Sequence, residues 1–234
     1  MDPFGAHRIQ KNKDTTMFDC ELVGKIGSMA LIRADEYEID YNVFSRIGAE
    51  LKPGIIWVSS GAVEIGRLDY RKRNYIDNIS EDLDNASYAS QGQSIMMENY
   101  RKFINPQYSV RQVLVEHQHF NVLEKRDFIK KLLLNCVKQN AIPIVNYNDS
   151  VSNEETRKME LYSLRNTQNK VVECIDNDET ASEIASLMKS KYLLILTSSE
   201  GLLSDPQKPD SIIKEVNGKD IYELQDNINE LKKL

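Results

Sequence analysis

Short, almost continuous apolar runs alternate with helix-patterned segments along most of this chain. The strand-sized runs cover residues 20–26, 54–58, 110–115, 141–146 and 191–197. A strand that is apolar on both sides indicates that both faces of its sheet are covered, as they are when parallel strands are connected by helices. The pattern therefore predicts an α/β fold, a three-layer αβα sandwich around a mainly parallel central sheet.

The segments between these runs have the apolar spacing of helices. Helices are predicted over residues 37–51, 60–67, 85–103, 126–139 and 178–190. The polar stretch 152–170 interrupts the alternation, and we expect a hairpin or a mobile flap there. Residues 1–16 are polar, lack the apolar core of a signal peptide and are expected to be a tag or a disordered leader.

Composition excludes several classes of function. The 234 residues contain 36 acidic and 30 basic side chains, a formal charge of -6, so no broad basic surface for nucleic acid is expected. No apolar run approaches the roughly 18 to 20 residues of a membrane span. Cys20, Cys136 and Cys174 have neither metal-site nor disulfide spacing, which favours a reducing, cytoplasmic location. His117 and His119 lack a third ligand nearby and are interpreted as structural or surface residues.

Ligands of open α/β sheets bind beyond the carboxyl ends of the strands, so the residues that follow each strand are informative. The first strand runs into GKIGS (24–28), where glycines would let an anion approach and Lys25 adds a positive charge; a plain tight turn would look the same. The second is followed by SSGA (59–62), which would place backbone N–H groups at a helix N-terminus, although ordinary capping explains the serines equally well.

The later strand ends carry amides and acids. NYNDS (146–150) could hold an ammonium group, or could be an Asx-rich turn. DND (176–178) opens a helix, where capping alone would explain the acids, but the same side chains could bind Mg²⁺ or position a lysine against phosphate. Thr197 ends the last predicted strand and Ser198 follows it, at a polar exit that suits a nucleotide or a simple turn.

Taken in order, these strings resemble the amino acid kinase family, and within it the glutamate 5-kinase branch. The resemblance rests on VGKIGS, WVSSGAVEIG, ASQGQ, RQVLV, IPIVNYNDSV, DNDETASEIA and LLILTSSEGLLSDP, and it spans about residues 23–206. N-x-N-D-S-V together with D-N-D separates this branch from the uridylate and aspartate kinases. The resemblance implies ATP-dependent phosphorylation of the γ-carboxylate of L-glutamate to glutamyl 5-phosphate, the first step of proline biosynthesis, with ATP and Mg²⁺ as cofactors.

The resemblance also implies roles for individual residues. Lys25 and Asp178 would be catalytic, the lysine neutralising the migrating phosphoryl group and the aspartate organising lysines. The amino acid would be bound by Ser60, Asn146, Asp149 and Asn177, with Asp149 facing its α-ammonium group. Phosphate and nucleotide would be bound by Gly27, Ser28, Gly61, Thr197 and Ser198. No residue is predicted to be a protein metal ligand.

Some positions depart from the family pattern. Tyr147 stands where the family usually has Glu, Ser198 stands where it has Asp, and its later glycine-rich segment with a second lysine has no match. Two alternatives therefore stay open: a related kinase with another acid or phosphate acceptor, or a non-catalytic glutamate- or proline-binding regulatory module.

The resemblance predicts one kinase domain over residues 17–234. Residues 17–173 would form its amino-acid-binding part and residues 174–234 a nucleotide-binding part that is incomplete at the C-terminus. As partners we expect L-glutamate, proline as an inhibitor, and further copies of the chain in a dimer or tetramer.

Overall fold

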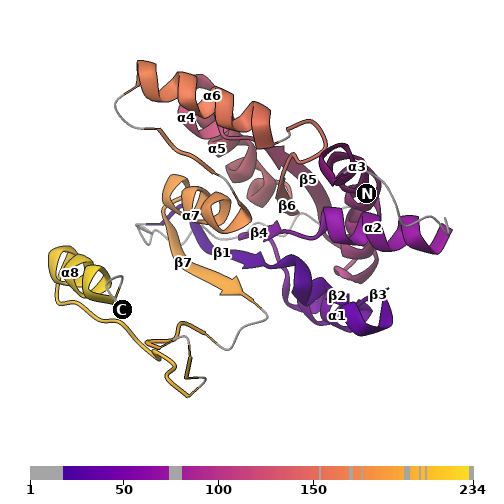
Figure 1. The fold of residues 1–234 in the computed structure, drawn as a ribbon, viewed down its shortest axis with the longest axis horizontal. Coiled ribbons are helices and arrows are strands. Elements are labelled where there is room, and N and C mark those ends of the chain that lie inside the picture. The colour runs from indigo at the N-terminus through magenta and orange to yellow at the C-terminus, as the bar shows by residue number, and fades with distance from the viewer. Residues whose placement is uncertain are drawn as a thin grey trace, which may run out of the picture.

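The side chains of successive strand residues point to opposite faces, and here both faces are apolar. The computed structural model describes residues 18–73, 81–152, 154–168, 171–174, 176–197, 201–205, 207–208 and 210–231, so the predicted leader 1–16 lies outside the described residues. A five-stranded sheet forms its centre (Figure 1). The strand order is β5 (Ser109–Val115), β6 (Ala141–Tyr147), β4 (Ile55–Ser59), β1 (Cys20–Ile26), β7 (Ser190–Leu196). Every pairing within this sheet is parallel.

Helices cover both faces of the sheet. In β4, Ile56 and Val58 belong to one buried cluster, whereas Ile55 and Trp57 belong to the other. The first cluster is completed by α4 (Gln118–Asn121), α5 (Leu123–Lys138) and α7 (Asn177–Leu187). The second is completed by α1 (Tyr41–Glu50), α2 (Ala62–Arg73) and α3 (Glu81–Phe103). The predicted αβα sandwich with a parallel sheet is confirmed.

Small elements complete the described chain. Between β1 and α1 lie two 3₁₀ turns, η1 (Ser28–Leu31) and η2 (Ala34–Glu36). The same stretch contains an antiparallel pair, β2 (Ile32–Arg33) and β3 (Glu38–Ile39). Helix α8 (Ile221–Leu231) lies beyond β7 in Figure 1. Among the described helices, none has both the length and the apolarity needed to cross a bilayer.

Helices α2 and α3 pack with their backbones in direct contact. A Cβ added at Gly92 would lie 1.8 Å from the carbonyl oxygen of Ala62, and one at Gly66 would lie 1.9 Å from that of Tyr88. Both distances are far below van der Waals contact, so only glycine allows this approach. The contact holds the N-terminus of α2, where the chain leaves β4.

The polar segment 152–170 forms a helix, α6 (Glu154–Thr167), so the expected hairpin or flap is wrong. Leu161 of this helix is buried, and the Glu160 carboxylate lies 3.1 Å from the buried imidazole of His117. A helix start is consistent with the sequence here, because acidic residues follow Ser152 and Asn153 directly. The helix was not predicted because the segment contains few apolar residues.

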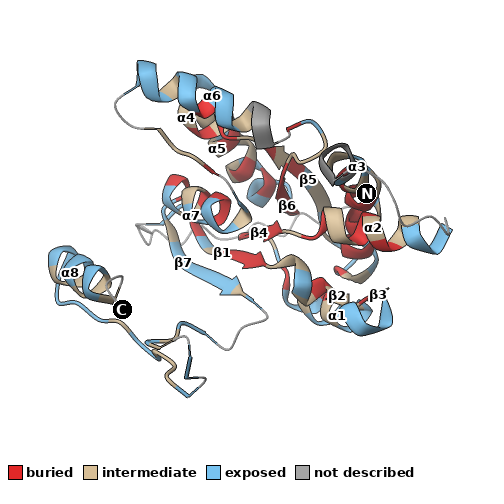
Figure 2. Cartoon of the chain, in the orientation of Figure 1, coloured by how far each residue is buried: buried red, intermediate tan, exposed pale blue. Residues whose placement is uncertain are grey.

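Strand β7 is correctly placed in the sheet, but the expectation that it is buried is wrong. It lies at the edge of the sheet, and its apolar side chains Tyr192, Leu193, Leu194 and Ile195 are all exposed, Tyr192 by 55% (Figure 2). Among the described strands β7 pairs with β1 only, so its side chains lack the contacts that a strand on its other side would supply. By contrast, Cys136 is fully buried in α5, and Cys20 and Cys174 are also buried free thiols.

Candidate active site

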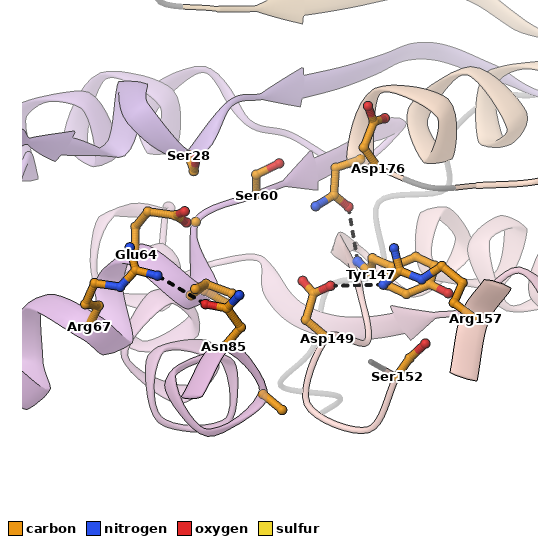
Figure 3. Close-up of a pocket in the computed structure, with 15 residues that line it drawn as sticks. Ser28, Ser60, Glu64, Arg67, Asn85, Tyr147, Asp149, Ser152, Arg157 and Asp176 are labelled. Carbon is orange, nitrogen blue, oxygen red and sulfur yellow. Dashed lines mark hydrogen bonds and ion pairs between the residues drawn. The ribbon is translucent and has the colours of Figure 1, made fainter. Parts of the chain in front are cut away.

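The carboxyl ends of β1, β4, β6 and β7 meet the N-termini of α2 and α7 at one edge of the sheet. Two adjoining cavities open there, and both are lined by Ser28, Ser60, Asp176 and Asn177. The larger cavity, about 410 Å³, is also lined by Gly61, Ala62, Val63, Glu64, Arg67, Asn85, Ala86, Tyr147, Asp149, Ser152 and Arg157 (Figure 3). The smaller cavity, about 270 Å³, is also lined by Lys25, Gly27, Met29, Ala30, Asp178 and Thr197.

An ion pair defines the smaller cavity. Lys25 Nζ lies 2.6 Å from Asp178 Oδ1, and the lysine side chain is buried while the aspartate is half exposed. A buried ammonium group is tolerated when it is paired with an acid. Here the paired ammonium group of Lys25 lies in the wall of the smaller cavity. The structure therefore brings together the two residues that the resemblance assigned to catalysis.

Gly27 contributes to the wall of this cavity rather than donating into it. Its backbone N–H donates to the carbonyl of Leu196 at 3.0 Å, which joins the end of β1 to the end of β7. This N–H is therefore engaged within the fold, and any phosphate contact at Gly27 stays a prediction. Thr197 lines the cavity beside it, whereas Ser198 lies outside the described residues.

The acids at the start of α7 divide their roles. Asp176 Oδ1 accepts hydrogen bonds from the backbone N–H groups of Asp178 at 2.8 Å and Glu179 at 2.9 Å, so Asp176 is the N-cap of the helix. Asp178 occupies the first turn, and its side chain pairs with Lys25 instead. Asp176 therefore serves as the helix cap, and Asp178 orients Lys25.

The turn after β4 presents Ser60 to both cavities. Ser59 points into the core, where its hydroxyl lies 2.8 Å from that of Tyr100. Gly61 has a φ of +108°, a conformation that side chains rarely adopt, and its carbonyl accepts the first hydrogen bond of α2 from Ile65 N. The glycine thus turns the N-terminus of α2 toward the larger cavity.

Asn146 lies behind the site rather than in it. Its side chain accepts from Asn177 Nδ2 at 2.9 Å and donates to Gln93 Oε1 at 2.8 Å, and the residue is only 1% exposed. Asn177 Oδ1 in turn accepts from the backbone N–H of Tyr147 at 3.1 Å. Of the two amides predicted to bind the amino acid, Asn177 lines both cavities and Asn146 holds it in place.

Asp149 and Arg157 face each other at one end of the larger cavity (Figure 3). Arg157 Nη2 lies 3.5 Å from Asp149 Oδ1, and its guanidinium carbon lies 4.0 Å from the centre of the Tyr147 ring. Burial raises the pKa of the Asp149 carboxyl above its usual 3.8, and Arg157 acts in the opposite direction. Arg157 was missed by sequence reasoning because the segment that carries it was not predicted as a helix.

The larger cavity has two more charged residues in its wall that sequence reasoning did not identify. Glu64 and Arg67 come from the first turns of α2, and Arg67 Nη2 donates to Asn85 Oδ1 at 3.1 Å. Glu64 and Arg67 are three residues apart on a helix that starts at the SSGA turn, so they share one helix face. This spacing could have identified them from the sequence.

His117 and His119 both make contacts within the fold. His117 Nε2 lies 3.1 Å from Glu160 Oε2, and its Nδ1 lies 3.5 Å from the Tyr147 hydroxyl. Burial lowers the pKa of the His117 imidazole below its usual 6.5. His119 Nδ1 accepts from the backbone N–H of Glu116 at 2.9 Å. Within the described ranges, no three His, Cys, Asp or Glu side chains cluster as a metal site would require.

The two adjoining cavities could bind two ligands side by side. The larger cavity offers a carboxylate to a cationic group, and the smaller one offers a lysine to an anion. Ser60 and Asn177 lie where the two spaces join, so reacting atoms of two molecules could be held next to each other there.

Comparison with known proteins agrees with this geometry. The model of the amino acid kinase family matches residues 22–231. Glutamate 5-kinase from Prochlorococcus marinus (strain MIT 9301) is 31% identical over 214 residues, which cover 86% of this chain and 53% of the relative. Glutamate 5-kinase from Bacteroides thetaiotaomicron is 30% identical over 209 residues, covering 84% of this chain and 52% of the relative.

The chain spans about half the length of the curated relatives it matches. The family match covers both cavities and the sheet that supports them. The chain therefore belongs to the amino acid kinase family.

Proposed function

We propose that the chain phosphorylates the γ-carboxylate of L-glutamate with ATP, as a glutamate 5-kinase does, and so forms glutamyl 5-phosphate at the start of proline biosynthesis. The observation that carries the proposal is the pair of adjoining cavities, one with Asp149 and one with Lys25, which join at Ser60 and Asn177. The names of the similar proteins support the choice of glutamate as the acceptor.

An amino acid fits the larger cavity by charge. The Asp149 carboxylate would receive the α-ammonium group, which stabilises the ionised form of a carboxyl that burial disfavours. The γ-carboxylate would then reach the junction at Ser60 and Asn177. Asn146 would act as a positioning residue, because its contacts are with Asn177 and Gln93.

The chemistry needs alignment and charge compensation rather than a base. A glutamate γ-carboxylate is already ionised at neutral pH, so one of its oxygens can attack the γ-phosphorus of ATP directly. The new C–O–P bond forms as the bond to the β,γ-bridging oxygen breaks, and ADP leaves with those electrons. Lys25 would neutralise charge on the transferred group, held toward it by Asp178.

The donor set is suited to Mg²⁺ that arrives with the phosphates. Mg²⁺ usually keeps several waters and takes one or two carboxylates plus phosphate oxygens. Asp176 and Asp178 are carboxylates at the smaller cavity, and the described part of the chain has no larger ligand cluster. Mg²⁺ would supply charge neutralisation there.

The remaining parts of the proposal follow the family. Residues 17–173 would bind the amino acid and residues 174–234 would contribute to nucleotide binding, within one domain that spans 17–234. The protein would work in the cytoplasm as a dimer or tetramer, with proline as an inhibitor.

Hydroxylamine trapping tests the proposal. Purified chain with ATP, Mg²⁺ and L-glutamate should give γ-glutamyl hydroxamate, and Lys25→Met should not. An ATP-consumption assay run over aspartate, N-acetylglutamate, carbamate and nucleoside monophosphates should show no phosphorylation of these acceptors. Phosphorylation of one of these in place of glutamate would support a related kinase, and glutamate binding without ATP binding would support a regulatory module; either result would overturn the proposal.

A further inference from the structure

We propose that Arg157 binds the α-carboxylate of the acceptor amino acid while Asp149 takes its α-ammonium group, so that the pair selects α-amino acids. This inference rests on the proposed function and extends it to a residue outside the family-like strings. It starts from the cavity wall formed by α6, the helix that sequence reasoning did not predict.

The two side chains have opposite charges at one end of the larger cavity. Arg157 Nη2 and Asp149 Oδ1 are 3.5 Å apart, longer than the roughly 2.7–2.9 Å of a tight charge-assisted hydrogen bond. Only 11% of the Arg157 side chain and 32% of the Asp149 side chain are exposed. A zwitterionic head group presents the complementary pair of charges at a similar separation, so it could pair with both side chains at once.

The guanidinium group is held against Tyr147, whose position is itself fixed by neighbouring contacts. It lies over the Tyr147 ring at 4.0 Å, a stacking distance that suits arginine better than lysine. One turn further along α6, Glu160 pairs with the buried His117, and His117 in turn approaches the Tyr147 hydroxyl. Arg157 is therefore preorganised, which lowers the entropic cost of binding a carboxylate.

The position of Asp149 and Arg157 agrees with the orientation that the proposed reaction requires of glutamate. If the γ-carboxylate is at Ser60 and Asn177, next to the Lys25 cavity, the α-carbon lies toward the far end of the larger cavity. Asp149 and Arg157 are in the lining of the larger cavity but not in that of the smaller one (Figure 3). The other cation of this cavity, Arg67, donates to Asn85 and lies over Tyr88, on the α2–α3 side.

4-Aminobutyrate provides a direct test, because it is glutamate without the α-carboxylate and keeps the amine and the distal carboxylate. Binding of each ligand would be measured by NMR titration of the full 234-residue chain without nucleotide, so the result does not depend on catalysis. The wild-type chain should prefer glutamate by about 10- to 100-fold, the range expected for one hydrogen bond to a charged partner. Arg157→Gln should reduce this preference to about threefold or less, mainly by weakening glutamate binding.

Controls separate the possible outcomes. Arg165→Gln makes the same change on an exposed turn of α6, where Arg165 pairs with Glu173, and should keep the wild-type preference. Arg157→Lys keeps the charge but not the planar guanidinium, and should retain only part of the preference even if Arg157→Gln folds poorly. An unchanged preference in both Arg157 variants, or its loss in Arg67→Gln instead, would overturn the inference alone. A wild-type chain that does not bind glutamate would overturn the proposed function as well.

Discussion

Lys25 Nζ lies 2.6 Å from Asp178 Oδ1, although the lysine belongs to the inner strand β1 and the aspartate to the first turn of α7. The lysine is buried and its partner is half exposed at the mouth of the smaller cavity. Asp176 caps the same helix by accepting from the backbone N–H groups of Asp178 and Glu179. The cap fixes the first turn of α7 and so places the Asp178 carboxylate next to Lys25. The charge of Lys25 therefore faces the cavity only when the strand and the helix are both in place.

Lys25→Met should lower the rate of phosphoryl transfer by at least about 100-fold, because removing one preorganised electrostatic contact to a transition state typically costs about 3–4 kcal/mol. The hydroxamate assay measures this rate. Lys52→Met is the matched control, since Lys52 is exposed, lies 3.9 Å from Glu21 and lines neither cavity. Equal activity of Lys25→Met and the wild-type chain would contradict the role given to Lys25.

Substitution of Asp176 separates helix capping from charge. Asp176→Ala removes both N-cap hydrogen bonds and should cost about 1 kcal/mol of stability. Asp176→Asn keeps an acceptor at the cap and should be nearly as stable as the wild-type chain, so any loss of activity in it would report on the charge. Urea denaturation and the hydroxamate assay measure the two effects, and an unstable Asp176→Asn variant would argue against the capping role.

Gly92→Ala should destabilise the chain by about 3 kcal/mol or more, since its Cβ would lie 1.8 Å from the Ala62 carbonyl oxygen and the two helix backbones would have to separate. Gly27→Ala is the control for stability. Its Cβ would lie 3.7 Å from the nearest atoms, and its φ of -73° suits any residue, so a change below about 0.5 kcal/mol is expected. Similar urea midpoints for the two variants would show that the α2–α3 contact can relax.

Stability should depend on pH through His117. Its pKa is lowered in the folded chain, mainly by burial, so the unfolded chain binds more protons as the pH falls below about 6.5. The free energy of unfolding should therefore decrease through this window on acidification, by at most about 1.4 kcal/mol per pH unit. Urea titrations between pH 7 and 5 should show a smaller slope for His117→Gln than for the wild-type chain or His119→Gln. Identical slopes would contradict this assignment.

The fold was largely predictable because its signals are local. Apolar runs and helical spacing depend on neighbouring residues, so they indicated the parallel sheet, its two covering layers and the strand ends where Lys25, Ser60 and Asp149 lie. The order of the strings at those ends also indicated the family, which the family match confirms. Helix α6 was missed because its sequence is strongly polar, so it lacks the apolar stripe that marked α5 and α7.

The division of work within the site required the tertiary structure. Asn146 and Asn177 look equivalent in sequence, yet one is buried against Gln93 and the other lines both cavities. The N–H of Gly27 is used by Leu196, a residue far along the chain. Which polar groups remain exposed to a ligand depends on partners brought from distant segments, and local patterns do not contain that information.

By itself, the sequence determined the αβα architecture, the edge of the sheet that carries the candidate site and the membership of the amino acid kinase family. Only the tertiary structure decided that β7 is an exposed edge strand and that Arg157 faces Asp149 in the larger cavity. The physical reason is the range of the interactions involved. Periodicity along one segment specifies an element, whereas exposure and charge pairing depend on how separate elements pack together.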